Sequence, residues 1–261
     1  MLRALAMILL TSPALAETQD EVVSARLLPG WRLDMGNYMA ALQLDLAPEW
    51  KTYWRAPGEA GIPPVFDWSG SQNVKAVRFH WPSPEVIVLN GMTSIGYHDA
   101  LTLPFDVEPL DESQPVKVVL KMDLGVCKDI CMPASLQFKG ILGGSQLDPQ
   151  IMAALQDRPR TAKEAGLTAI GCELAPIDDG LRITARIGLP DQGGAETVVF
   201  ETADSAVWVA EAQASRQGGV LTAATDLVPP GGIPFALDRS GVTVTVLAQG
   251  KAVEIKGCPA P

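Results

Sequence analysis

The chain is organised around residues 116–142, which read VKVVLKMDLGVCKDICMPASLQFKGIL. Residues 116–124 have the pattern of a strand that leads into a short loop, and residues 136–142 are a second apolar run that leads out of it. The loop carries Cys127 and Cys131, with three residues between them, and Pro133 stiffens its end. Two thiols this close form a local disulfide, bind a metal ion or exchange electrons with another thiol pair.

Short strand-like segments recur along most of the chain. Before the cysteines they cover residues 22–27, 39–46, 65–68, 74–81 and 101–107. After them they cover residues 167–174, 181–187, 197–201, 207–212, 220–227 and 242–247. Pro29-Gly30 and Gly36-Asn37 are read as turns between the first strands. Short strands at regular spacing with turns between them predict an all-β chain of two antiparallel sandwiches.

One helix is predicted between the sandwiches. Asp148 suits the N-cap, Pro149 suits the first turn, and Ile151, Met152 and Leu155 fall on one face. A proline ends the helix near residue 158, and the small, polar residues 161–166 are read as a linker. The predicted layout is a signal peptide over residues 1–16, a first sandwich over 17–147, a helix and linker over 148–166, and a second sandwich over 167–261.

The first residues resemble a secretory signal. Arg3 precedes the apolar residues 4–10, and Ala14-Leu15-Ala16 forms a cleavage site before Glu17. No later run reaches the roughly 18 apolar residues of a transmembrane helix. We expect a soluble exported protein that does not insert into the membrane after signal removal, in an oxidising compartment. The formal net charge of −10, without a basic cluster, argues against nucleic acid as a partner.

Four cysteines permit three pairings, and the sequence alone does not choose among them. Cys172 lies on the first strand of the second sandwich and Cys258 lies next to the chain end. A bridge between them closes a loop of about 85 residues, for which the chain-entropy model gives roughly 4–5 kcal/mol. We therefore predict that this pair is a structural disulfide.

A disulfide between Cys127 and Cys131 would stabilise the fold little, because closing so short a loop removes little entropy from the unfolded chain. The two residues either face each other across a tight hairpin or stack one helical turn apart. Lys128 favours a thiolate by its charge, whereas Asp129 opposes it. We predict a redox-active pair, with metal ligands and an inert local bridge as the alternatives.

A copper site is the main alternative. Soft cysteine and methionine ligands select Cu(I), and a C-x3-C motif before proline also occurs in the copper-handling Sco proteins. His80, His98, Met92 and Met132 are further candidate ligands. The Sco fold alternates strands and helices, which this sequence does not, and the two histidines lack the spacing of a zinc site. We therefore predict no metal and no cofactor, with Cu(I) at Cys127 and Cys131 as the alternative.

Several motifs resemble one family. They are WKTYWRAPG (residues 50–58), FDWSGS (66–71), RFHWP (78–82), NGM (90–92), IGYHD (95–99) and GVCKDICMP (125–133). Together they resemble the periplasmic N-terminal region of the thiol:disulfide interchange protein DsbD and its ScsB relatives. The three-residue spacing of the cysteines follows ScsB, and residues 167–261 resemble the longer ScsB-type extension.

The resemblance implies an immunoglobulin-like β-sandwich that carries a redox cysteine pair, and we expect both sandwiches to be of this class. It implies that Cys131 forms mixed disulfides and that Cys127 resolves them. A loop that caps the cysteines in DsbD corresponds to residues 89–97, where Met92 or Tyr97 would shield the pair.

The resemblance also implies the partners. They are thioredoxin-like or disulfide-isomerase-like periplasmic proteins and a membrane electron donor, which we expect to be a separate chain. The aromatic residues Trp50, Tyr53 and Trp54 are predicted to form a surface beside the cysteines, with ordinary sandwich core as the alternative.

We therefore predict a periplasmic protein that exchanges dithiol and disulfide with other proteins through Cys127 and Cys131, by thiolate attack through a mixed disulfide. The first alternative is a copper-binding or copper-tolerance protein that uses the same cysteines. The second is a redox-silent interaction module in which both disulfides are structural.

Overall fold

The computed structural model describes residues 18–89, 91–233 and 235–261, so the predicted signal peptide lies outside the described residues. A short helix, α1 (Gln19–Val22), precedes the first strand. The strands that follow are β1 (Val23–Arg32), β2 (Tyr38–Leu46), β3 (Lys51–Tyr53), β4 (Val65–Asp67), β5 (Val74–Phe79), β6 (Glu85–Leu89), β7 (Met92–His98), β8 (Ala100–Pro109), β9 (Lys117–Cys127) and β10 (Cys131–Ile141).

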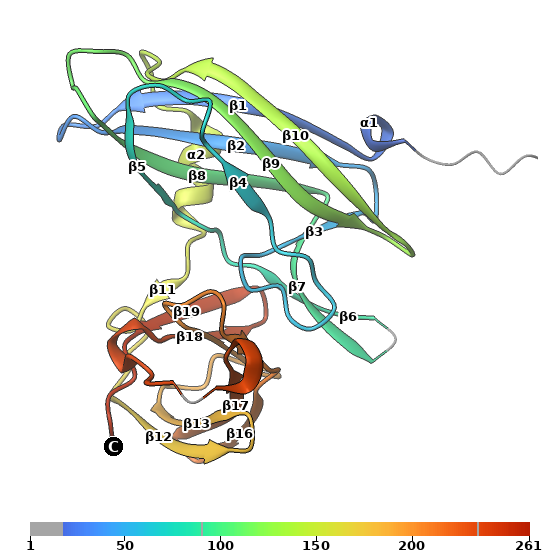
Figure 1. Cartoon of the computed structure of the whole chain (residues 1–261), viewed down its shortest axis with the longest axis vertical. Helices are drawn as coiled ribbons and strands as arrows, with labels where there is room; N and C mark the ends of the chain where they lie inside the picture. The colour runs from blue at the N-terminus through green and yellow to red at the C-terminus, as the bar shows by residue number, and fades with distance from the viewer. Residues whose placement is uncertain (1–17, 90, 234) are drawn as a thin grey trace, which may run out of the picture.

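These strands form the first sandwich, the upper body in Figure 1. Its first sheet has the order β1-β2-β8-β5, and its second has the order β10-β9-β3-β7-β6, with β4 paired to β9. Apolar side chains alternate along the strands and meet between the sheets, as Leu120 and Met122 of β9 do with Leu103 and Phe105 of β8 in one buried cluster.

The second part of the chain begins with α2 (Pro149–Gln156). Its strands are β11 (Arg160–Thr161), β12 (Ala169–Ile177), β13 (Gly180–Gly188), β14 (Thr197–Glu201), β15 (Trp208–Val209), β16 (Gln213–Gln217), β17 (Val220–Val228), β18 (Thr243–Ala248) and β19 (Lys251–Lys256), with the short 3-10 helices η1 (Pro230–Gly232) and η2 (Arg239–Gly241) before β18. The third sheet has the order β11-β19-β18-β14, and the fourth has the order β12-β13-β17-β15, with β16 paired to β17. The structure confirms the predicted all-β fold.

The third sheet is buried on both faces. Its inward side chains, such as Val244 and Val246 of β18, join the core of the second sandwich. Its outward side chains Leu247 and Ala252 are buried in the core cluster of the first sandwich, and Val199 packs against that cluster. The two bodies in Figure 1 therefore share an apolar interface.

The predicted helix forms with Asp148 as its N-cap, which accepts hydrogen bonds from the backbone N–H groups of Gln150 and Ile151. Ile151 packs against the outer face of the first sheet. Met152, which was predicted to share this face, is instead exposed, because it points about 100° around the helix from Ile151. No helix among the described residues is long and apolar enough to cross a membrane.

Three local predictions are corrected by the structure. Thr161, the first residue of the predicted linker, pairs with β19 as part of strand β11. Residues 92–97 of the predicted capping loop belong to strand β7, because they pair with β6 on one side and β3 on the other. The predicted turn at Pro29-Gly30 is a register shift inside β1, because the chain keeps its pairing with β2 on both sides of it.

Cys172 and Cys258 form a disulfide across a sequence separation of 86 residues. Both residues are fully buried in the core of the second sandwich. The backbone N–H of Cys172 donates to the carbonyl oxygen of Pro259 at 2.7 Å, so the chain end is also held to β12 by its backbone.

The register shift in β1 depends on a glycine. Gly30 has a φ of 60°, and a Cβ atom there would lie 1.8 Å from the carbonyl oxygen of Met39. We expect Gly30→Ala to lower the free energy of unfolding by at least about 2 kcal/mol, measured by urea denaturation. Gly219→Ala is the matched control, because a Cβ atom there meets nothing within 4 Å. Equal stabilities of the two variants would contradict this account of the strand.

Candidate functional site

The two nearby cysteines close the hairpin between β9 and β10. Cys127 ends β9, Cys131 begins β10, and the two are direct partners in the antiparallel register. They form a disulfide, and their Cα atoms lie 4.1 Å apart. The loop between them is held by a backbone hydrogen bond of 3.0 Å from Lys128 N–H to the carbonyl oxygen of Ile130. Of the two arrangements left open by the sequence, the protein has the hairpin.

The two sulfur-bearing residues differ sharply in exposure. Cys127 is only 1% exposed, whereas Cys131 is exposed. The difference follows from the order of the strands, because β9 has β10 on one side and β3 on the other, while β10 is an edge strand. A reagent from solution therefore meets Cys131 first.

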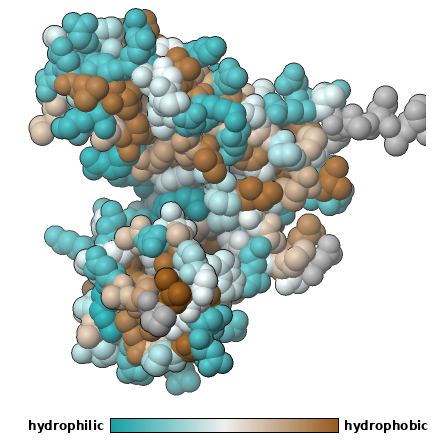
Figure 2. Space-filling model, viewed as in Figure 1, coloured by the Kyte–Doolittle hydropathy of each residue, from teal (hydrophilic) through white to brown (hydrophobic). Residues whose placement is uncertain are grey.

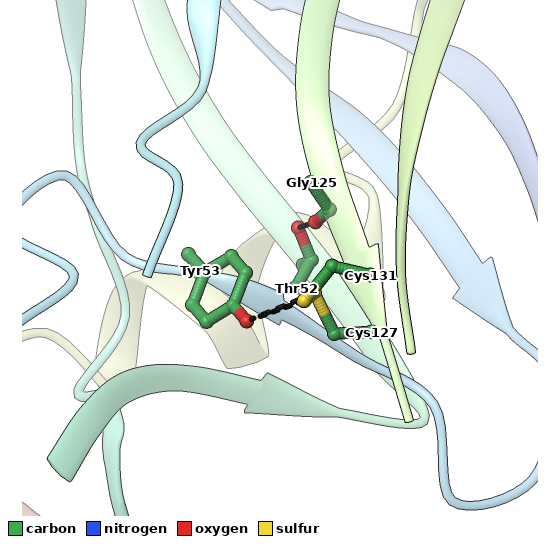
Figure 3. Close-up of a disulfide and its surroundings, with 5 residues drawn as sticks. All are labelled: Thr52, Tyr53, Gly125, Cys127 and Cys131. Carbon is green, nitrogen blue, oxygen red and sulfur yellow. Dashed lines mark hydrogen bonds between the residues drawn. A yellow bond between two sulfur atoms is a disulfide. The ribbon is translucent and has the colours of Figure 1, made fainter. Parts of the chain in front are cut away.

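Tyr53 contacts both sulfur atoms. Its hydroxyl donates a hydrogen bond of 2.9 Å to Cys127 Sγ and lies 3.6 Å from Cys131 Sγ. Figure 3 shows the ring of Tyr53 pointing at the disulfide from β3. The residue is 2% exposed, and burial raises the pKa of its phenol, so it remains a proton donor at neutral pH.

Two further features hold Tyr53 in this position, and neither was predicted from the sequence. The hydroxyl of Thr52 donates to the carbonyl oxygen of Gly125 at 3.0 Å, which ties β3 to β9 beside the cysteines. Gly125 lies two residues before Cys127, and a Cβ atom there would be 2.9 Å from Ile62 Cβ and 3.3 Å from the ring of Tyr53. A glycine inside a strand is the sequence signal for such a close approach.

Two lysines neighbour the cysteine pair, one across the sheet and one in the loop. Lys51 is buried and is the direct cross-strand neighbour of Cys127, so the two side chains lie on the same face of the sheet. Lys128 in the loop forms an ion pair of 2.6 Å with Glu49, and this contact lowers the pKa of the Glu49 carboxyl. The loop lysine is therefore paired with a carboxylate, and Lys51 is the lysine that shares a face of the sheet with Cys127.

The aromatic residues predicted to form a surface are in the interior. Trp50, Tyr53 and Trp54 are all buried, because β3 is an inner strand of its sheet. Trp50 and Trp54 belong to the core of the first sandwich. Of the three, the structure shows only Tyr53 in a hydrogen bond with a sulfur atom.

The two candidate capping residues lie on β7. Tyr97 is buried, donates its hydroxyl to the carbonyl oxygen of Pro82 at 2.9 Å and stacks on Trp81. Met92 is 57% exposed and pairs with Leu89 where β6 and β7 meet. Shielding of the disulfide by either residue stays a prediction.

The histidines have partners of their own. His80 Nε2 lies 2.8 Å from Asp106, and His98 Nδ1 lies 3.0 Å from Glu85. Within the described residues, no three His, Cys, Asp or Glu side chains form a group suited to a metal ion. Copper binding by Cys127 and Cys131 stays a prediction.

Comparisons with known proteins agree with this architecture. Residues 24–142 match the family described as "Thiol:disulfide interchange protein DsbD, N-terminal". The chain is also similar to the crystal structure of the N-terminal periplasmic domain of ScsB from Proteus mirabilis. That likeness has a TM-score of 0.64 and 23% sequence identity, and it covers 91% of this chain and 92% of the other. The shared fold therefore extends through both sandwiches. No curated protein matches the sequence.

The hydroxyl of Tyr53 is placed to stabilise a thiolate at Cys127 when the disulfide opens. We expect Tyr53→Phe to slow reduction of Cys127–Cys131 by dithiothreitol at pH 7 about tenfold, because a hydrogen bond to a charged group is worth about 1.5–3 kcal/mol. The rate is measured by trapping free thiols at intervals and locating them by peptide mass spectrometry.

Tyr97→Phe is the matched control, since it removes a buried phenol hydroxyl that bonds to Pro82 instead of to sulfur. If both variants are reduced at the same rate as the native chain, Tyr53 has no part in opening the disulfide.

Proposed function

Because residues 24–142 form a DsbD N-terminal-like domain, we propose that this protein exchanges dithiol and disulfide with other proteins through Cys127 and Cys131. The observation that carries the proposal is the asymmetry of one disulfide. An exposed Cys131 is joined to a buried Cys127, whose sulfur accepts a hydrogen bond from Tyr53. A purely structural bridge needs neither an exposed cysteine nor a proton donor beside the buried one.

When the protein accepts electrons, a thiolate of the donor attacks Cys131 Sγ. A new bond forms between the donor sulfur and Cys131, and the Cys127–Cys131 bond breaks. The electron pair leaves on Cys127, where the hydrogen bond from the Tyr53 hydroxyl favours the thiolate. A second thiolate of the donor then attacks the donor sulfur that is bonded to Cys131. The donor becomes a disulfide, and Cys131 is released as a thiolate.

When the protein donates electrons, the steps run in the opposite direction. The Cys131 thiolate attacks a disulfide in the acceptor and forms a mixed disulfide with it. Cys127, 4.1 Å away between Cα atoms, then attacks Cys131 Sγ and expels the acceptor as a dithiol. Two electrons leave the protein, and its own disulfide is restored.

The surroundings of Cys131 suit a protein partner. Ile130 at the loop tip is 68% exposed, and Ile62, which packs on Gly125, is 46% exposed. Figure 2 shows brown, apolar surface at the end of the first sandwich where β9 and β10 meet. Exposed apolar residues around a reactive group fit docking by thioredoxin-like or isomerase-like proteins, and an exported chain would meet them in the periplasm.

Trapping tests the roles of the two cysteines. The Cys127→Ser variant keeps the exposed thiol but cannot resolve a mixed disulfide. Incubated with an oxidised thioredoxin-fold protein, it is expected to accumulate a one-to-one covalent adduct that disappears with dithiothreitol, seen on non-reducing gels. Cys131→Ser is expected to give at least about tenfold less adduct, because its remaining thiol is buried.

The Cys172→Ser/Cys258→Ser double variant controls for thiols elsewhere and should give no lasting adduct, because its exchanging pair is intact. Accumulation by Cys131→Ser in place of Cys127→Ser would reverse the assigned roles. Absence of adduct from both single variants would remove the exchange function.

A further inference from the structure

The loop between β3 and β4 lies against the cysteine site. We call residues 55–64 the covering loop. A Cβ atom on Gly61 would lie 2.9 Å from the ring of Tyr53, and a Cβ atom on Gly125 would lie 2.9 Å from Ile62. The covering loop therefore packs on Tyr53 and on the face of β9 that carries Cys127, since residues two apart on a strand face the same way.

The first residue of the covering loop is bound by the second sandwich. Arg55 Nε and Nη2 donate to the two carboxylate oxygens of Glu201 at 2.8 and 2.9 Å. Arg55 Nη2 also donates to Glu254 at 2.8 Å. The three side chains are only about a quarter exposed, with values of 25%, 23% and 25%, so water screens the ion pairs weakly.

The contact joins the covering loop to the third sheet, which is distant from it in sequence. Glu201 lies on β14 and Glu254 on β19, and both face out of the second sandwich. The guanidinium also lies 4.2 Å from the centre of the Trp54 ring, one residue after Tyr53. Burial opposes the charge, but the two carboxylates raise the pKa of Arg55, so the group remains a cation.

The covering loop has open space on its far side. A cavity of about 470 Å³ lies between Arg55, Pro57 and Gly61 of the covering loop and β14 and β15 of the second sandwich. The covering loop is held to β7 by a backbone hydrogen bond of 2.9 Å from Ile95 N–H to the carbonyl oxygen of Pro57, but it faces open space on the side of the second sandwich. Its ion pairs with Glu201 and Glu254 are the specific polar link across that gap.

We propose that Arg55 is a positioning residue for the Cys127–Cys131 pair, and that the second sandwich acts through it. Glu201 and Glu254 hold the start of the covering loop over the ring of Tyr53, whose own strand is fixed by its pairing with β7 and β9. Without the two carboxylates, this part of the covering loop moves into the cavity behind it. The assignment rests on the proposed exchange function for its biological meaning, but the positioning itself is measurable without any exchange partner.

The test is alkylation of Cys127 by iodoacetamide in chains that carry Cys131→Ser, with Cys172–Cys258 left oxidised. Adding Glu201→Gln and Glu254→Gln is expected to raise the alkylation rate of Cys127 about tenfold, because a guanidinium left without carboxylates leaves its mostly buried position. In chains with both cysteines, the same two substitutions are expected to slow reduction by dithiothreitol, and to slow it no further when Tyr53→Phe is already present.

Asp226→Asn is the matched control. Arg182 of the second sandwich donates two hydrogen bonds to the carboxylate of Asp226, as Arg55 does to Glu201. The substitution disrupts this pair and leaves the covering loop unchanged. If the double glutamine variant does not fold, as judged by circular dichroism, Glu254→Gln alone keeps the two bonds to Glu201 and is expected to give a smaller rise, about threefold.

Alkylation of Cys127 at the rate of the Asp226→Asn control would overturn the positioning role, and so would additive slowing with Tyr53→Phe. Failure of the exchange function has a different signature. The native disulfide would then fail to exchange with a thioredoxin-fold protein, whatever the alkylation rates show.

Discussion

The hydrogen bond from Tyr53 to the sulfur of Cys127 connects the fold of this protein to its chemistry. It exists because β3 lies between β7 and β9, which buries Tyr53 and points its hydroxyl at the end of β9. The neighbouring Gly125 leaves room for the ring, and the covering loop closes over it. The site is therefore built from an inner strand, a glycine and a loop whose first residue is held by the second sandwich.

The two disulfides of the chain have opposite surroundings. Cys172 and Cys258 are both buried, and they join segments that are 86 residues apart. The loop closed by such a bridge is long, which is where the entropic gain from cross-linking is large. Cys127 and Cys131 close a loop that β9 and β10 already close by their pairing, so the bond adds little to stability. Cys131 of this pair is exposed, whereas both cysteines of the other disulfide are buried.

The sequence predicted the features that depend on local pattern. Alternating side chains in residues 116–124 predicted β9, and Asp148 predicted the start of α2. It did not predict that β1 continues past Gly30, because a register shift is a property of two paired strands. It also missed the contacts of Arg55, whose partners are 146 and 199 residues away in the chain. Such contacts depend on how two sandwiches dock, which no local pattern records.

A redox titration in glutathione buffers tests the central claim most directly, because it compares the two disulfides within one molecule. Thiols are trapped at each potential and assigned by peptide mass spectrometry. An exchange protein predicts that Cys127–Cys131 is half-reduced between about −120 and −270 mV while Cys172–Cys258 stays oxidised. If both pairs stay oxidised below about −300 mV, the Cys127–Cys131 bond is structural and the account is contradicted.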